Sequence, residues 1–147
     1  MARRESENSK ERMSTIHSLT LSQITDLHHL YRSQWWTRDR TLDETRSLVE
    51  HSSLIVGFAD VRGHLVAFAR VLSDFTIKAL IFDLIIDESH RHKGLGKALL
   101  QTILNHPRLS RIRHFELYCL PEMAPYYESF GFKELNHELI LMRKDRK

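Results

Sequence analysis

One apolar stretch, followed by a polar segment that contains glycine, constrains the fold more than any other feature of this sequence. Residues 79–86 are apolar at every position except Asp83, which is typical of a strand in the interior of a sheet, covered on both faces. After a polar segment, apolar residues recur from Gly94 to His106 at the spacing of an amphipathic helix, which Pro107 ends. A strand, a loop and a helix in direct succession are typical of α/β proteins.

The other periodic segments extend this unit into a mixed sheet with helices on both faces. Ser22 is the predicted N-cap of the first helix, and Thr41 with Glu44 forms a predicted capping box at the second. Glycine and aspartate between two apolar runs predict a hairpin over residues 54–72. We predict strands at residues 16–21, 54–59, 65–72, 79–86 and 114–120, one or two more within 132–142, and helices at 23–31, from 42, 94–106 and 122–130.

Length, charge and cysteine content limit the classes of protein. The chain of 147 residues suits one domain, predicted over residues 14–147 after a flexible polar tail, residues 1–13, that lacks the apolar stretch of a secretory signal. A single cysteine, Cys119, cannot form an internal disulfide, which favours a reducing compartment such as the cytoplasm. No apolar run is long enough to cross a membrane, so we expect no membrane partner.

The basic and imidazole residues show no pattern of a nucleic-acid or metal site. The net charge of +3 is a mild excess, and no recognition motif for nucleic acid accompanies it. The ten histidines do not show the spacing of zinc ligands, so no metal is predicted.

The segment from residue 87 to residue 98 has the features of a phosphate-binding loop. Gly94 and Gly96 at the start of the helix let a ligand approach the backbone closely. The first N–H groups of a helix have no acceptor within the helix, and the helix dipole favours an anion there. Arg91, Lys93 and Lys97 add positive charge. The pattern predicts a pyrophosphate site, although an ordinary helix start with a basic first turn remains an alternative.

Two other phosphate-binding motifs fit this segment poorly. The dinucleotide motif G-x-G-x-x-G requires a third glycine where this chain has Leu99. A P-loop requires serine or threonine after the lysine, and Ala98 follows Lys97.

Two motifs together resemble the GCN5-related N-acetyltransferases, the GNAT superfamily. Residues 91–96, Arg-His-Lys-Gly-Leu-Gly, match the family pattern [RQ]-x-x-G-x-[GA] after a strand. Residues 127–132, Tyr-Glu-Ser-Phe-Gly-Phe, match its second pattern, Y-x-x-[FL]-G-F. The resemblance covers about residues 14–142. It implies the acyl-CoA N-acyltransferase fold, a mostly antiparallel sheet splayed between two parallel strands, and an acetyltransferase that moves an acetyl group from acetyl-CoA to an amine by direct attack in a ternary complex.

The resemblance also implies which residues bind the co-substrate. The pantetheine arm is expected along the backbone of the strand that precedes the loop, and the pyrophosphate on the amides of the loop and the first helical turn. The cofactor-binding residues predicted in this way are Leu84, Ile85, Ile86, Arg91, His92, Lys93, Gly94, Leu95, Gly96, Lys97 and Tyr127.

Tyr127 and Asp83 are the predicted catalytic residues. Tyr127 matches the family's recurrent tyrosine, and a phenol with a pKa of about 10 can protonate the departing thiolate; it could instead only pack on the coenzyme. Asp83 is the candidate base because burial in an apolar strand would raise its pKa; it could instead be a structural aspartate bonded to a turn or to the hydroxyl of Tyr31 or Tyr118. A water chain, Glu116 and Glu122 are the alternatives for the base. A backbone N–H near Leu84, exposed by a strand bulge, is the expected oxyanion donor.

The resemblance further implies that the first two helices and their connection frame the acceptor site. Tyr31, Trp35 and Trp36 are the predicted substrate-binding residues, since adjacent tryptophans could form an aromatic wall for an amine; the tryptophans could equally anchor their loop. A small-molecule amine is the predicted acceptor, and a protein lysine or N-terminus is the alternative. A coenzyme A-binding sensor without turnover is the second functional class. Edge strands near the C-terminus would permit a homodimer.

Overall fold

The computed structural model describes residues 12–146 in two units, the first ending at Leu117 and the second beginning at Tyr118. The predicted flexible tail therefore lies almost wholly outside the described residues. The first unit is a five-stranded sheet in the order β1-β2-β3-β4-β5. Its strands are β1 (Ser14–Ile16), β2 (Leu54–Ala59), β3 (Leu65–Ser73), β4 (Lys78–Ile86) and β5 (His114–Leu117).

The sheet is mixed, as the sequence predicts. Strands β1 to β4 pair antiparallel with their neighbours, and β4 pairs parallel with β5. The parallel ladder ends where Ile81 faces Leu117, so the last five residues of β4 extend beyond its pairing with β5. The fold class of an acyl-CoA N-acyltransferase is thereby confirmed.

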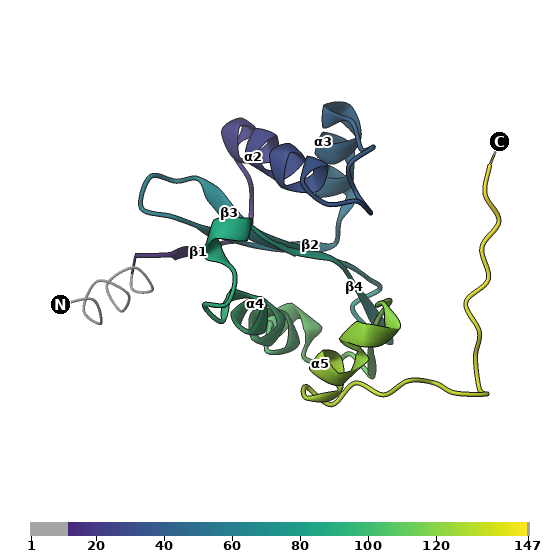
Figure 1. Cartoon of the computed structure of the whole chain (residues 1–147). Helices are drawn as coiled ribbons and strands as arrows, with labels where there is room; N and C mark the ends of the chain where they lie inside the picture. Colours follow the sequence, from purple (N-terminus) through teal and green to yellow (C-terminus); the bar gives the residue numbers. More distant parts are fainter. Residues whose placement is uncertain (1–11, 147) are drawn as a thin grey trace. The chain divides into compact units, whose positions relative to one another are not determined.

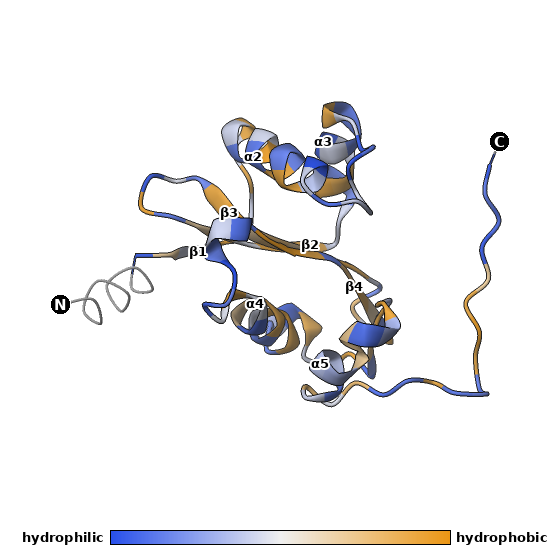
Figure 2. Ribbon diagram, viewed as in Figure 1, coloured by the Kyte–Doolittle hydropathy of each residue, from blue (hydrophilic) through white to orange (hydrophobic). Residues whose placement is uncertain are grey.

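Helices cover both faces of this sheet. Figure 1 shows α2 (Leu21–Arg32) and α3 (Leu42–His51) on one face and α4 (Leu95–Leu104) on the other. The strands between them are coloured as the most apolar part of the unit in Figure 2. Leu99, Leu100 and Ile103 of α4 are buried, and two short 3₁₀ turns, η1 (Glu88–His90) and η2 (Pro107–Leu109), flank this helix. The packing of α4 on β2, β3 and β4 fixes the loop that precedes it.

Reciprocal capping boxes begin both helices on the first face. Thr41 accepts from the N–H of Glu44 at 3.1 Å and Glu44 accepts from the N–H of Thr41 at 3.0 Å, as predicted. The N-cap of α2 is Thr20 and not Ser22, so that prediction is wrong. Gln23 lies three residues after Thr20 and returns the bond, whereas Ser22 is followed at that distance by a threonine. The strand predicted over residues 16–21 is wrong in both bounds, because β1 is Ser14–Ile16 and Thr20 already begins the helix.

A β-bulge interrupts the pairing of β3 and β4. Phe68 faces Ile85 and Arg70 faces Phe82, so the single residue between them on β3 lies opposite two residues, Asp83 and Leu84. Asp83 adopts a left-handed backbone with φ of 56°. Directly paired residues share a face of the sheet, so the extra residue reverses the side-chain alternation of β4 beyond the bulge. Apolar side chains of β4 therefore lie on both faces of the sheet, as predicted for an interior strand.

The second unit is small and contains no strand among residues 118–146. Its ordered elements are η3 (Pro121–Met123) and α5 (Ala124–Glu128), where the sequence predicts one continuous helix. Gly131, with φ of 93°, closes the turn after α5 by donating its N–H to Glu128 at 2.9 Å.

The strands predicted within residues 132–142 are absent, and that prediction is wrong. The segment is apolar enough for a strand, but a strand needs a partner for its N–H and C=O groups, and this unit contains no other strand. Leu139, Ile140, Leu141 and Met142 are consequently exposed.

Candidate active site

The loop between β4 and α4 is fixed first at Asp87. Its N–H donates to the carbonyl of Val66 at 2.8 Å, and its carboxylate accepts from the ring of His90 at 2.8 Å and from the hydroxyl of Ser89. Burial alone would raise the pKa of Asp87, but the hydrogen bonds from Ser89 and His90 outweigh burial and lower it. The carboxylate therefore stays ionised and holds the short 3₁₀ turn in place.

The end of this loop leaves the start of α4 open. His92 and Gly94 have left-handed backbones, with φ of 62° and 79°. Gly94 is the N-cap of α4, and no side-chain hydrogen bond caps this helix. A Cβ atom built on Gly94 would meet no atom within 4 Å, so the space beside the backbone is open here.

Basic side chains surround this open helix start. Arg91, Lys93 and Lys97 are exposed, and Nε of Arg91 lies 3.4 Å from the carbonyl of Ile86. The first-turn N–H groups and these cations form an arrangement that can bind an anion such as a diphosphate. The predicted roles of His92, Leu95 and Gly96 at this position stay predictions.

The strand residues predicted to bind the pantetheine arm differ in burial. Ile85 is a core residue, packed with α2, while Leu84 and Ile86 are half-buried. All of them lie beyond the end of the β4–β5 ladder. A backbone role for them is compatible with this position, and it stays a prediction.

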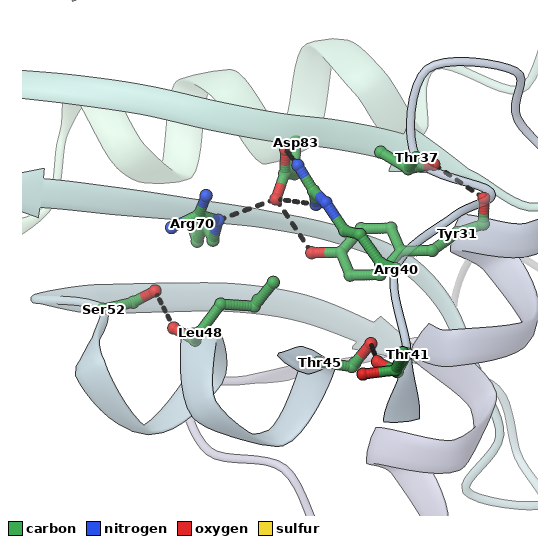
Figure 3. Close-up of polar contacts among 9 residues, drawn as sticks. All are labelled: Tyr31, Thr37, Arg40, Thr41, Thr45, Leu48, Ser52, Arg70 and Asp83. Atoms are coloured by element: carbon green, nitrogen blue, oxygen red, sulfur yellow. Dashed lines mark hydrogen bonds and ion pairs between the residues drawn. The ribbon is translucent and has the colours of Figure 1, made fainter. Parts of the chain in front are cut away.

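Asp83 lies at the centre of a buried polar cluster on the α2 side of the sheet (Figure 3). It accepts from the hydroxyl of Tyr31 at 2.9 Å, from two nitrogens of Arg40 at 2.6 and 3.1 Å, and from Nε of Arg70 at 2.7 Å. The side chain is 4% exposed. Burial on its own would raise the pKa of Asp83, but the hydrogen bonds and charges of Arg40 and Arg70 lower it below its usual range.

The predicted rise in the pKa of Asp83 is therefore wrong, and with it the physical argument for a general base. A carboxylate paired with two guanidinium groups is a weak proton acceptor. The hydrogen bond from the hydroxyl of Tyr31, a partner named in the structural alternative, is present. The role of Asp83 in the reaction stays a prediction.

Tyr31 is fully buried, which corrects its predicted contact with the acceptor. Its ring packs edge-on against Phe68 at 6.4 Å, and Arg40 lies over its face at 4.6 Å. Burial, and then the charge of Asp83, raise the pKa of Tyr31 far above its usual value, so the hydroxyl remains a donor. Tyr31 is a core residue, because its ring packs between α2 and the sheet.

The α2–α3 loop, residues 33–40, presents both tryptophans to solvent. Trp35 is 66% exposed and Trp36 42% exposed. The loop is anchored instead by Thr37, whose hydroxyl donates to the carbonyl of Tyr31 at 2.7 Å, and by Arg40. The exposed rings are available to a ligand, and their contact with an acceptor stays a prediction.

Sequence reasoning missed Arg40, Arg70 and Thr37. One signal could have found Arg70: it interrupts the apolar strand of residues 65–72 as Asp83 interrupts the next one. Opposite charges inside adjacent strands of one hairpin indicate a buried ion pair.

In the second unit, Tyr127 belongs to α5 and is packed among aromatic rings. Its ring makes edge contacts with Tyr126 at 5.2 Å and with Phe132 at 6.1 Å, and Tyr126 also contacts Phe130 at 5.3 Å. Burial, and then the neighbouring Tyr126 and Cys119, raise the pKa of Tyr127 to about 12. The phenol therefore keeps its proton near neutral pH, as a proton donor must.

Residues 12–146 contain no three His, Cys, Asp or Glu side chains placed to hold a metal ion. None of the helices in this part of the chain combines the length and the apolar character that crossing a membrane requires. A surface hollow of about 550 Å³, lined by residues of β2, α2, α3 and η2, contains none of the predicted site residues.

Comparison with known proteins relates the chain to acetyltransferases. The profile of the acetyltransferase (GNAT) family matches residues 21–132, a range that includes the loop and Tyr127. The uncharacterized N-acetyltransferase ycf52 of Porphyra purpurea is 30% identical over 110 residues, which are 73% of this chain and 63% of that protein. Serotonin N-acetyltransferase 2, chloroplastic, of rice is 27% identical over 96 residues, 63% of this chain and 48% of that protein.

A solved structure extends this similarity to the fold. A GNAT-family protein of Xanthomonas campestris superposes with a TM-score of 0.78 at 30% identity, covering 91% of this chain and 93% of that one. The chain spans about six tenths of the length of the first curated relatives that it matches. The family profile covers both motifs and most of the chain, and the superposition covers nearly all of it. The protein belongs to the GNAT family of acetyltransferases.

Proposed function

We propose that this protein transfers an acetyl group from acetyl-CoA to the primary amine of a small molecule, by direct attack in a ternary complex. The observation that supports the co-substrate most strongly is the start of α4. It has a left-handed glycine as N-cap, no capping side chain, and open space where a Cβ would lie. A helix start of this kind, among Arg91, Lys93 and Lys97, is a suitable site for a diphosphate.

The reaction needs two contributions from this chain, a proton donor and an oxyanion donor. The amine nitrogen forms a bond to the thioester carbon, the C–S bond breaks, and the amine proton leaves to water. Tyr127, whose phenol stays protonated, would give its proton to the departing thiolate and regain one from water. A backbone N–H at the bulge near Leu84 would stabilise the oxyanion, because a bulge takes backbone groups out of the regular ladder.

The acceptor is proposed to be an amine with an aromatic or alkyl body. Trp35 and Trp36 offer two exposed aromatic faces on the α2–α3 loop, and aromatic faces attract ammonium groups and apolar chains. The name of the rice relative, a serotonin N-acetyltransferase, agrees with an amine of this kind.

The compartment is proposed to be reducing, because Cys119 is an exposed free thiol. The cytoplasm is the expectation from sequence, and the name of the rice relative assigns that protein to the chloroplast. Imaging of the tagged full-length protein in its own cells distinguishes the two.

The co-substrate site is tested with Gly96→Glu. The variant places bulk and negative charge in the first turn of α4, so we expect the Kd for coenzyme A, measured by calorimetry, to rise about 100-fold or more, which is about 2.7 kcal/mol. Gln101→Glu is the matched control, because it adds the same charge to the same helix at an exposed position beyond its first turn. Equal affinity of the two variants for coenzyme A would refute the pyrophosphate site.

Turnover is tested separately from binding. The wild-type protein is assayed with acetyl-CoA and a panel of aryl and alkyl amines, lysine peptides and N-terminal peptides. Transfer to the small amines supports the proposal. Transfer to peptides alone would refute a small-molecule acceptor and indicate a protein lysine or N-terminus. Binding of coenzyme A without transfer to any acceptor would identify a sensor module.

A further inference from the structure

The carboxylate of Asp83 is almost saturated with donors. Oδ2 accepts from Tyr31, from Arg40 and from Arg70, and Oδ1 accepts a second bond from Arg40. An ionised carboxylate offers about four acceptor positions, so little capacity remains for a proton from a substrate. Two guanidinium groups and one carboxylate also leave one positive charge in excess, which does not attract an ammonium ion.

The donors come from three separate elements around the α2–α3 loop. Tyr31 lies in the last turn of α2, Arg40 at the end of the loop directly before the N-cap of α3, and Arg70 on β3. The ring of His28 also donates to the carbonyl of Arg40 at 3.1 Å. Trp35 and Trp36 project from the part of the loop that lies between these attachments.

Asp83 itself occupies the bulge of β4. Its left-handed backbone is unfavourable for most residues and tolerable for aspartate and asparagine. Such a conformation persists where surrounding bonds hold it in place. The bonds to Arg40 and Arg70 do so from the loop side and from the neighbouring strand.

We infer that Asp83 is a positioning residue that attaches the α2–α3 loop, through Arg40, to the bulge of β4. The contact of this loop with the acceptor rests on the proposed function. Asp83 holds Trp35 and Trp36 at a fixed place relative to the bulge, and it takes no proton from the amine. The acceptor reaches the thioester as a neutral amine that has lost its proton to water.

The attachment itself can be measured without any assay of activity. Trp35 and Trp36 are the only tryptophans of the chain, so intrinsic fluorescence reports on this loop alone. Asp83→Asn keeps the shape and the tolerance of a left-handed backbone but removes the charge. We expect this variant and Arg40→Gln each to increase acrylamide quenching about twofold. Tryptic cleavage after Arg38, a site that both variants keep, should be accelerated about tenfold, because a loop that opens more often is cut faster.

The kinetic effect separates positioning from proton transfer. If Asp83 positions the loop, Asp83→Asn and Arg40→Gln both raise the KM for the amine, by about tenfold or more. They leave the affinity for coenzyme A within about threefold, since the helices that the loop joins and α4 lie on opposite faces of the sheet. The double variant should then show little more than the single effects, because both remove one attachment.

A base would give a different pattern. Loss of a general base lowers kcat by about 10²- to 10⁴-fold at an unchanged KM and removes one ionisation from the pH profile. The inference would be overturned if Asp83→Asn showed this low kcat at an unchanged KM while Arg40→Gln did not. The groups that face Asp83 are Tyr31, Arg40 and Arg70. An acidic limb shared by the pH profiles of wild type and Asp83→Asn supports positioning, because it cannot come from the Asp83 carboxylate.

Asp43→Asn is the matched control, since it removes an exposed carboxylate from α3 close to the same loop. Its quenching and its kinetics should equal those of wild type. If Asp83→Asn does not fold, the results for Arg40→Gln decide whether the attachment exists. This variant keeps the ion pair of Asp83 with Arg70, so the buried charge stays compensated. Failure of the wild type to acetylate any amine would refute the proposed function and leave the fluorescence result standing; unchanged quenching in both variants would refute the attachment itself.

Discussion

At the scale of single residues, the surroundings shift the pKa values of the two predicted catalytic side chains in opposite directions. Asp83 and Tyr127 are both partly or wholly buried, and burial alone raises the pKa of each acid. For Tyr127 the neighbours are aromatic rings and a thiol, which do not oppose that effect, and the pKa rises to about 12. For Asp83 two arginines reverse the effect. The chemistry of each group follows from its partners in space, which its residue type does not reveal.

The proton-donor role of Tyr127 gives a prediction at this scale. Tyr127→Phe keeps the ring and removes the proton, so we expect kcat to fall about 100-fold while the Kd for coenzyme A changes by less than about threefold. Because the raised pKa keeps the phenol protonated up to high pH, Tyr127 should cause no alkaline loss of activity below about pH 11 in the wild type. Tyr126→Phe, which alters the adjacent ring in the same way, serves as control. Equal kcat in the two variants would contradict the role.

At the scale of elements, α3 begins where the α2–α3 loop ends. Thr41 caps the helix through Glu44 and directly follows Arg40, the residue that joins the loop to the sheet. Thr45 donates its hydroxyl to the carbonyl of Thr41 at 2.8 Å, so the first turn is fixed from within. A short helix of this kind depends on its cap because it has few internal hydrogen bonds of its own.

Removal of this cap should therefore destabilise the protein measurably. We expect Thr41→Ala to lower the free energy of unfolding by about 1 kcal/mol, read from urea denaturation followed by circular dichroism. Glu44→Gln is the control, because a glutamine can return the same bond, and its urea midpoint should match the wild type. A loss as large in the control would indicate that charge at the helix start matters more than the cap.

At the scale of the whole molecule, burial is concentrated in the first unit. Its sheet, α2 and α4 contain all the fully buried apolar side chains of the described residues. In the second unit, the apolar segment around Ile140 forms no strand, and Ile140 is 81% exposed. The stability of a single chain should thus depend on the first unit and hardly on this segment.

Ile140→Lys tests that distribution. The variant should change the free energy of unfolding by less than about 0.5 kcal/mol, as exposed substitutions do. Ile103→Ala, at a buried position of α4, should cost about 2–5 kcal/mol in the same experiment. The homodimer expected from exposed edge strands stays a prediction, and sedimentation of wild type and Ile140→Lys tests it. A large loss of stability or of association in Ile140→Lys would show that the segment is covered in solution.

The sequence by itself determined the features that depend on near neighbours in the chain. The capping box at Thr41, the hairpin of β2 and β3, and the glycine-rich start of α4 are each set by residues a few positions apart, so local spacing sufficed to predict them. The family resemblance came from two such local motifs. The predicted C-terminal strands failed because a strand depends on a partner that local spacing cannot supply.

Only the tertiary structure decided which residues surround Asp83. Its partners Tyr31, Arg40 and Arg70 lie 52, 43 and 13 residues away in the chain. Whether they meet depends on the register of β3 against β4, and one extra residue in a strand turns the following side chains to the other face. The pattern of apolar residues in β4 is compatible with either register, so the sequence could not show on which face of the sheet this carboxylate would lie.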